Sequence, residues 1–334
     1  MSRFLGLVTA LVVIAQPLVG AQAPPASQAP DHPSQPLAPT SVASPSFTSG
    51  VDVVTLTVTV TDQSDHYIRD LTRHDFTLSE DGVQQPVSFF GRSDVPLDLS
   101  IVIDTSASMY QNMAILKQGA IGLVRTLGRD DRVSVIEFRD VMRVLQPMTA
   151  QHGRAAAAIA SLRPSGSTSL YNALYVTLRG MATVEAPAEV RRRALVVFSD
   201  GLDTSSLVTF EDVMEAARRA AVSVYVVSLH GPDHGERVQG FASEQDYNLR
   251  SLAEQTGACA FFPVTAMDIQ QVYKTLAAEL ASQYALGYVP LNGSRDGGWR
   301  RVSVRVADRP GAHARARTGY YASRGAWLSS LLQH

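Results

Sequence analysis

The sequence predicts an α/β fold in which a doubly wound, mostly parallel sheet is inserted into a small β-sandwich-like unit made by the two flanks. Two observations predict it. Between residues 96 and 283, short apolar strands alternate with amphipathic helices, which is typical of a parallel sheet covered on both faces. The flanks show strands only, and neither has enough of them to be stable alone. We therefore expect the flanks to pack together.

Length, hydrophobic content and net charge limit the class of protein and its partners. The chain has 334 residues, 45% of them hydrophobic, which suits a globular protein with one or two domains. The formal net charge is -2, and basic residues are neither in excess nor clustered. This balance argues against nucleic acid or an acidic membrane surface as a partner.

The pattern of residues 1–23 predicts a signal peptide. Arg3 gives the positive start, residues 4–14 form the apolar core, and Ala21-Gln22-Ala23 fits the small-x-small cleavage rule. An uncleaved anchor is the alternative, but the apolar run is shorter than the ~20 residues that span a bilayer. We expect a secreted or periplasmic protein without a transmembrane segment after signal removal.

Residues 24–50 are rich in Pro, Ala, Ser and Gln and predict a disordered linker. The N-terminal β segment, 51–95, begins with an unbroken Val/Leu and Thr alternation at 54–61, which predicts a strand with its threonine face toward solvent. Asp81-Gly82 predicts a hairpin turn between strands at 76–78 and 87–90.

The α/β region, 96–283, opens with an apolar strand at 97–103. Apolar runs and helical spacing then predict the remaining elements in order. The further strands are expected at 133–138, 141–145, 195–198, 222–229 and 260–262, and the helices from about 109, at 154–162, 170–181, 209–220, 247–256 and 268–283.

The C-terminal β segment, 284–322, shows strand patterns at 284–289, 302–306 and 314–321, and a tail follows at 323–334. The chain has one cysteine, Cys259, so no intrachain disulfide can form. Cys259 lies in a short apolar strand without a basic neighbour in the sequence, which predicts a buried, unreactive thiol.

The residues that follow the first apolar strand predict a cation-binding loop. Asp104, Ser106 and Ser108 place a carboxylate and two hydroxyls at alternate positions between a strand and a helix. Hard oxygen ligands suit Mg²⁺, Mn²⁺ or Ca²⁺, and ligands bind at the carboxyl ends of the strands in open α/β sheets. The alternative is that Asp104 only caps the helix and the serines are turn residues.

Three segments together resemble the von Willebrand factor A domain family. They are Asp104-x-Ser106-x-Ser108-Met109, the run Gly166-Ser167-Thr168-Ser169-Leu170 at a helix start, and Ser199-Asp200-Gly201 after a later apolar strand. The resemblance covers roughly residues 97–283. The flanks, with DLTRHDFTLSEDG before the domain and QYALGYVP after it, look similar to a secreted bacterial group of such proteins.

The resemblance implies a metal-ion-dependent adhesion site. Carried over by position, Asp104, Ser106 and Ser108 belong to its first loop, Thr168 to its second and Asp200 to its third. These five residues would hold Mg²⁺, or Mn²⁺ or Ca²⁺, with one coordination position left for an acidic group of a protein partner. One departure is that 109–112 hold no acidic residue, so the adjacent second metal site of integrin domains has no obvious ligand.

The sequence does not favour an enzyme. A phosphatase that forms an aspartyl-phosphate typically has a second carboxylate two residues after its nucleophile, and Ser106 stands there instead. No Gly-x-Ser-x-Gly elbow of a serine hydrolase occurs. We expect a non-enzymatic, metal-dependent, adhesion-type module that captures an Asp or Glu carboxylate. The alternative is a structural or assembly protein of the cell envelope in which the metal only stabilises the fold.

Overall fold

The computed structural model describes residues 53–92, 94–183, 190–200, 203–229, 244–307 and 309–324. The predicted signal peptide, the linker and the tail from residue 325 lie outside the described residues. Among the described helices, none is long and apolar enough to cross a membrane.

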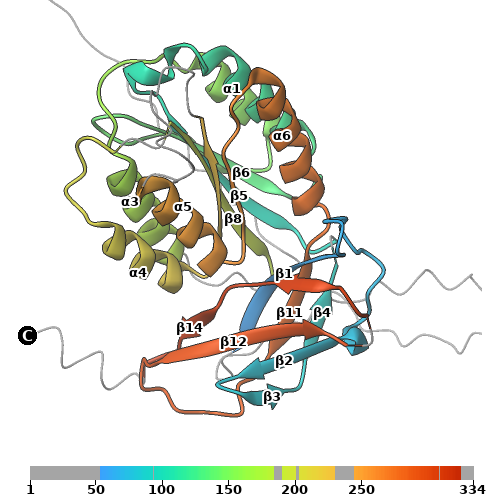
Figure 1. The fold of residues 1–334 in the computed structure, drawn as a ribbon. Helices are drawn as coiled ribbons and strands as arrows, with labels where there is room; N and C mark the ends of the chain where they lie inside the picture. Colours follow the sequence, from blue (N-terminus) through green and yellow to red (C-terminus); the bar gives the residue numbers. More distant parts are fainter. Residues whose placement is uncertain are drawn as a thin grey trace, which may run out of the picture. The chain divides into compact units, whose positions relative to one another are not determined.

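The α/β domain is built on a six-stranded sheet with the order β10-β9-β8-β5-β6-β7 (Figure 1). All neighbouring pairs are parallel except β6 and β7. The strands are β5 (Leu97–Asp104), β6 (Arg132–Phe138), β7 (Arg143–Thr149), β8 (Arg192–Ser199), β9 (Ser223–Ser228) and β10 (Ala260–Phe261).

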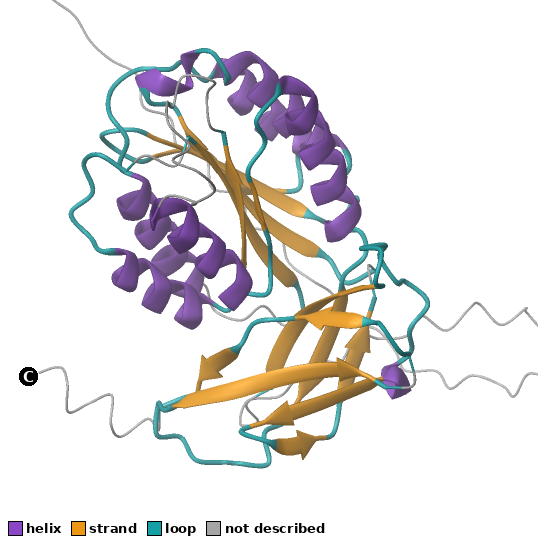
Figure 2. Ribbon diagram, viewed as in Figure 1, coloured by secondary structure: helices purple, strands orange, loops and turns teal. Residues whose placement is uncertain are grey.

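Helices cover both faces of this sheet (Figure 2). The described helices are η2 (Ala107–Tyr110), α1 (Met113–Arg125), α2 (His152–Ser161), α3 (Leu170–Thr183), α4 (Phe210–Ala220), α5 (Glu244–Gln255) and α6 (Ala266–Leu280). The central strand β5 is buried along its whole length. Its Ile101 and Ile103 pack with α1, α2 and α6, whereas Val102 packs with α3, α4 and α5 on the other face.

The two flanks form one β unit of two four-stranded antiparallel sheets, ordered β13-β1-β11-β4 and β14-β12-β2-β3. Its elements are β1 (Val54–Thr61), η1 (Arg73–Asp75), β2 (Phe76–Glu80), β3 (Val83–Gln85), β4 (Phe89–Gly91), β11 (Tyr284–Tyr288), β12 (Trp299–Val306), β13 (His313–Arg315) and β14 (Gly319–Tyr321). Both sheets join strands from opposite ends of the chain, and their inner faces share one apolar core. The predicted fold class is therefore confirmed.

Several boundaries differ from the sequence prediction. The partner of β2 across the Asp81-Gly82 turn is β3, while the strand expected at 87–90 is β4 in the other sheet. The strand expected at 314–321 is two strands, β13 and β14, which belong to different sheets. Helix α1 starts at Met113 after the 3-10 turn η2, and α6 ends at Leu280 before a turn into β11. The differences between the strands arise from tertiary pairing, which local sequence patterns do not contain.

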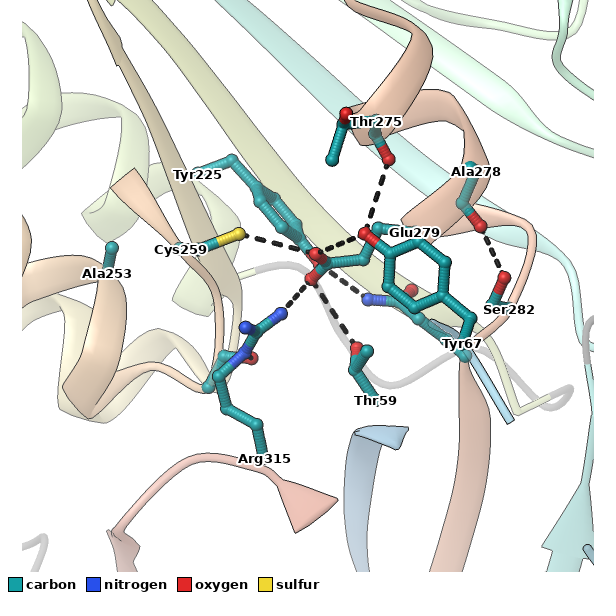
Figure 3. A network of polar contacts seen from close by, with 12 residues as sticks. Thr59, Tyr67, Tyr225, Ala253, Cys259, Thr275, Ala278, Glu279, Ser282 and Arg315 are labelled. Carbon is teal, nitrogen blue, oxygen red and sulfur yellow. Dashed lines mark hydrogen bonds and ion pairs between the residues drawn. The ribbon is translucent and has the colours of Figure 1, made fainter. Parts of the chain in front are cut away.

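Thr59 also departs from the expectation of a solvent-facing threonine row. It is buried because its hydroxyl faces the carboxylate of Glu279, at the end of α6, at 3.5 Å. This carboxylate lies in a polar network between the α/β domain and the β unit (Figure 3).

Glu279 is buried and accepts hydrogen bonds from five side chains. Within the α/β domain, Tyr225 donates at 2.8 Å and the Cys259 thiol at 3.3 Å. From the β unit the other donors come from both flanks, namely Thr59, Tyr67 at 3.2 Å, and Arg315, which also forms an ion pair with Glu279.

Burial raises the pKa values of the Cys259 thiol and the Tyr225 hydroxyl, and the adjacent Glu279 charge raises them further. Both groups therefore stay protonated and act as donors to Glu279. The predicted unreactive character of Cys259 agrees with this position, because a raised pKa suppresses the nucleophilic thiolate.

We predict that Glu279→Gln destabilises the protein by about 2–3 kcal/mol in urea unfolding followed by circular dichroism. Breaking a fully buried ion pair costs about 3–5 kcal/mol, because the remaining charge stays buried. The expected loss is smaller here since 34% of the Arg315 side chain is exposed.

Asp70→Asn is the control for this experiment. Asp70 pairs with Arg309 on the exposed surface within the β unit, so removing its charge should cost clearly less than Glu279→Gln does. Equal losses in the two variants would show that the Glu279 network does not stabilise the junction.

Candidate functional site

The candidate site lies at the carboxyl ends of β5 and β8, the two central strands of the sheet. Asp104 is the last residue of β5, and Asp200 directly follows β8. Thr168 lies in the loop between α2 and α3, two residues before α3 begins. Parallel strands bring their carboxyl ends to the same edge, which is why residues about 100 positions apart converge here.

Backbone hydrogen bonds hold the first two loops together. The amide of Ala107 donates to the carbonyl of Gly166 at 3.0 Å, and the amide of Ser165 donates to the carbonyl of Thr105 at 2.7 Å. Gly166 has a φ of +80°, and a Cβ at this position would lie 2.2 Å from Oδ2 of Asp140. The turn that presents Thr168 therefore requires glycine.

The third loop is tied to both others. Ser199, the last residue of β8, donates its hydroxyl to Oδ2 of Asp104 at 2.7 Å. Further along, the Thr204 amide donates to the carbonyl of Thr168 at 3.0 Å, and the Thr168 amide donates to the Thr204 hydroxyl at 3.2 Å. All three loops are thus held at one place by direct hydrogen bonds.

The oxygen atoms of the site differ in exposure and in hydrogen bonding. Asp104, Ser106, Thr168 and Asp200 are buried, whereas Ser108 is exposed. The hydroxyls of Ser106 and Ser108 lie 2.9 Å apart, and the Ser106 amide donates to Oδ1 of Asp104 at 2.8 Å. The hydroxyl of Thr168 forms no hydrogen bond with the described residues, so its lone pairs remain available.

Two carboxylates share this buried edge. Burial raises the pKa of Asp104 to about 6, and the neighbouring Asp200 charge adds to the rise, while the hydrogen bonds from Ser199 and Ser106 oppose it. Two like charges in a poorly solvated place repel each other, and a cation between them would relieve the repulsion. The donors are hard oxygens, which fits Mg²⁺, Mn²⁺ or Ca²⁺.

This donor set does not resemble a transition-metal cluster. Within the described ranges, no three His, Cys, Asp or Glu side chains come together in a way that could hold an ion. A cation at this edge would therefore depend on hydroxyl oxygens as much as on carboxylates.

The sequence predicted the candidate ligands but not the residues that hold them in place. Ser199 belongs to the Ser199-Asp200-Gly201 segment, yet its contact with Asp104 could not be inferred from that segment. Asp140 was also missed. Its carboxylate accepts hydrogen bonds from the amide and the hydroxyl of Ser167, and so fixes the loop that carries Thr168. No sequence signal marked it, because it lies in a turn after β6.

Comparison with known proteins finds two similar curated proteins. It is 25% identical over 240 residues to the UPF0353 protein of Mycolicibacterium paratuberculosis, covering 64% of this chain and 69% of that protein. It is 35% identical over 91 residues to an uncharacterised protein of Synechocystis sp., covering 26% of this chain but 22% of that protein.

A solved structure, the von Willebrand factor type A protein from Catenulispora acidiphila, is similar with a TM-score of 0.47 and 13% identity, covering 85% of this chain and 76% of that one. The model of the von Willebrand factor type A domain matches residues 98–275, just over half of the chain. That match runs from β5 into α6 and includes all three loops of the candidate site. The chain therefore belongs to the von Willebrand factor type A domain family.

Proposed function

We propose that this chain is an exported, non-enzymatic binding module that captures an acidic group of a protein partner through one divalent cation. Asp104, Ser106, Ser108, Thr168 and Asp200 would hold the cation, with Mg²⁺ as the expected ion and Mn²⁺ or Ca²⁺ as alternatives. When bound, the cation would supply positive charge and one coordination position for a carboxylate oxygen from outside.

The observation that carries the proposal is the convergence of two buried carboxylates and three hydroxyl side chains on loops that are hydrogen-bonded to one another. A structural cap would need one carboxylate at a helix start. It would not need Asp200 close enough to raise the pKa of Asp104. A bound cation requires a second carboxylate, whereas a helix cap does not.

The surroundings of the site suggest what else a partner presents. Three large apolar side chains near the loops are strongly exposed, namely Tyr110 at 77%, Val141 at 66% and Leu207 at 94%. Tyr110 follows Ser108 by two residues. Val141 follows Asp140, which holds the second loop, and the Leu207 amide donates to Asn172 at the start of α3. Exposed apolar side chains on the segments that carry the site could add apolar contacts to a bound partner. We expect a partner acid flanked by apolar residues.

Export is supported by the sequence alone, through Arg3, the apolar run 4–14 and Ala21-Gln22-Ala23. The alternative role, a structural or assembly protein in which the cation only stabilises the fold, uses the same ligands and is separated below by experiment.

We predict that Mg²⁺ raises the melting temperature of the parent chain and not that of Asp104→Asn or Asp200→Asn. A ligand at 100 times its Kd adds about 2.7 kcal/mol to the folded state, which for a domain of this size corresponds to roughly 5–10 °C. Thermal unfolding with Mg²⁺ and with chelator measures the difference.

Asp130→Asn serves as the control for charge removal. Asp130 is exposed and precedes β6, at the amino edge of the sheet, so this variant should respond to Mg²⁺ as the parent does. An undiminished Mg²⁺ response in both site variants would place the cation elsewhere in the chain.

Peptide display tests the capture of an acid. We predict that the immobilised chain in Mg²⁺ enriches random peptides that contain Asp or Glu beside apolar residues, and that chelator or Asp104→Asn abolishes the enrichment. Leu207→Ser and Tyr110→Ser should weaken the apolar preference and leave the acid preference intact, because they remove only the exposed apolar groups.

The same experiment separates the two roles. If Asp104→Asn enriches the same peptides as the parent but has lost the stabilisation by Mg²⁺, the cation is structural and the acid-capture proposal is wrong. If enrichment is lost while the metal-free melting temperature is unchanged, the cation takes part in binding directly.

A further inference from the structure

A second pocket lies away from the candidate cation site, where the helix ends of the α/β domain meet the β unit. It has a volume of about 540 Å³ and is lined by side chains from α4, the end of α5, β12 and β14. Helices that follow parallel strands end at the amino edge of the sheet, so this pocket and the cation site lie at opposite edges. Binding at the cation site therefore does not account for this pocket.

The lining carries positive charge without a matching acid. Arg218 and Arg301 both line the pocket, and no Asp or Glu does. Glu215, the acid closest in sequence to Arg218, is already engaged by Arg219 and by the Tyr321 hydroxyl, at 2.6 Å each. Arg301 is exposed, and its guanidinium forms no ion pair with the described residues.

The guanidinium of Arg218 is held in place, but not all of its N–H groups form hydrogen bonds. Its Nη2 donates to Oε1 of Gln255 at 2.7 Å, and its guanidinium carbon lies 5.4 Å from the centre of the Trp299 ring. Its Nε is buried and forms no hydrogen bond with the described residues.

The remaining wall is aromatic. Trp299 and Tyr321 pack edge to face with ring centres 5.1 Å apart, and both line the pocket. These rings offer apolar surface beside the two guanidinium groups. A ligand that matches the pocket needs an anionic head and an apolar body. The planar fork of arginine suits a carboxylate, which accepts two parallel hydrogen bonds.

We propose that this pocket binds a small organic acid, with its carboxylate at Arg218 and Arg301 and its apolar body against Trp299 and Tyr321. The site is independent of the divalent cation, because it shares no residue with the loops that carry Asp104, Thr168 and Asp200. Its occupant bridges the α/β domain and the β unit, since its walls come from both.

The test uses 3-phenylpropionate as the probe and the full chain in a Trp327→Phe background, which leaves Trp299 as the single tryptophan. We predict a saturable change in Trp299 fluorescence with a Kd of about 1 mM, which is ordinary for a ligand of this size. Arg301→Gln should raise the Kd about tenfold, because it removes one charge-assisted contact. The neutral 3-phenylpropanamide should bind about tenfold more weakly than the acid.

Arg305→Gln is the matched control, on the same exposed side of β12 four residues away and outside the pocket. It should leave the Kd unchanged. Arg301→Gln is preferred to Arg218→Gln because Arg218 also supports the local structure, and melting temperatures of all variants check folding.

Three results would overturn the proposal. They are equal affinity for the acid and its amide, equal affinity of Arg301→Gln and Arg305→Gln, or displacement of the probe by the same concentration of inorganic phosphate. The first would leave an apolar cleft, the second would place binding elsewhere, and the third would leave a general anion site in which the aromatic wall has no part.

Discussion

The joining of the α/β domain to the β unit depends on the buried carboxylate of Glu279. It is buried at the end of α6, and its charge can be tolerated only while donors from both flanks reach it. Thr59 and Arg315 are 256 residues apart in the chain, yet they contact the same carboxylate. The β unit is therefore required at its place beside α6, in addition to the apolar core that its own two sheets share.

This constraint also decides which edge of the sheet remains open. The chain enters β5 from the N-terminal flank and leaves α6 for β11, so both connections to the β unit lie at the amino edge. The carboxyl edge, with Asp104 and Asp200, carries no part of the β unit in the described residues. A partner of the kind proposed above could therefore reach that edge without displacing the flanks.

The sequence predicted the sheet, its covering helices and the residues of the candidate site, because apolar periodicity and short loop motifs are local signals. It could not predict that Thr59 turns inward, since the reason is a glutamate 220 positions away. It also could not separate β13 from β14, whose partners lie in different sheets. The positioning roles of Ser199 and Asp140 could not be predicted for the same reason. A residue that positions a ligand is recognised by its contact, and contacts across loops leave no pattern in one sequence.

The hydrogen bonds of the candidate site divide into two kinds that respond differently to a cation. Those between side chains, such as Ser106 with Ser108 and Ser199 with Asp104, use the oxygens that a cation would need. Those between backbone groups, such as Ala107 with Gly166 and Thr204 with Thr168, do not involve these oxygens. Binding would exchange the first kind and leave the second intact. A cation would therefore meet loops that are already held in place, and its binding would cost only the rotation of hydroxyl and carboxylate groups.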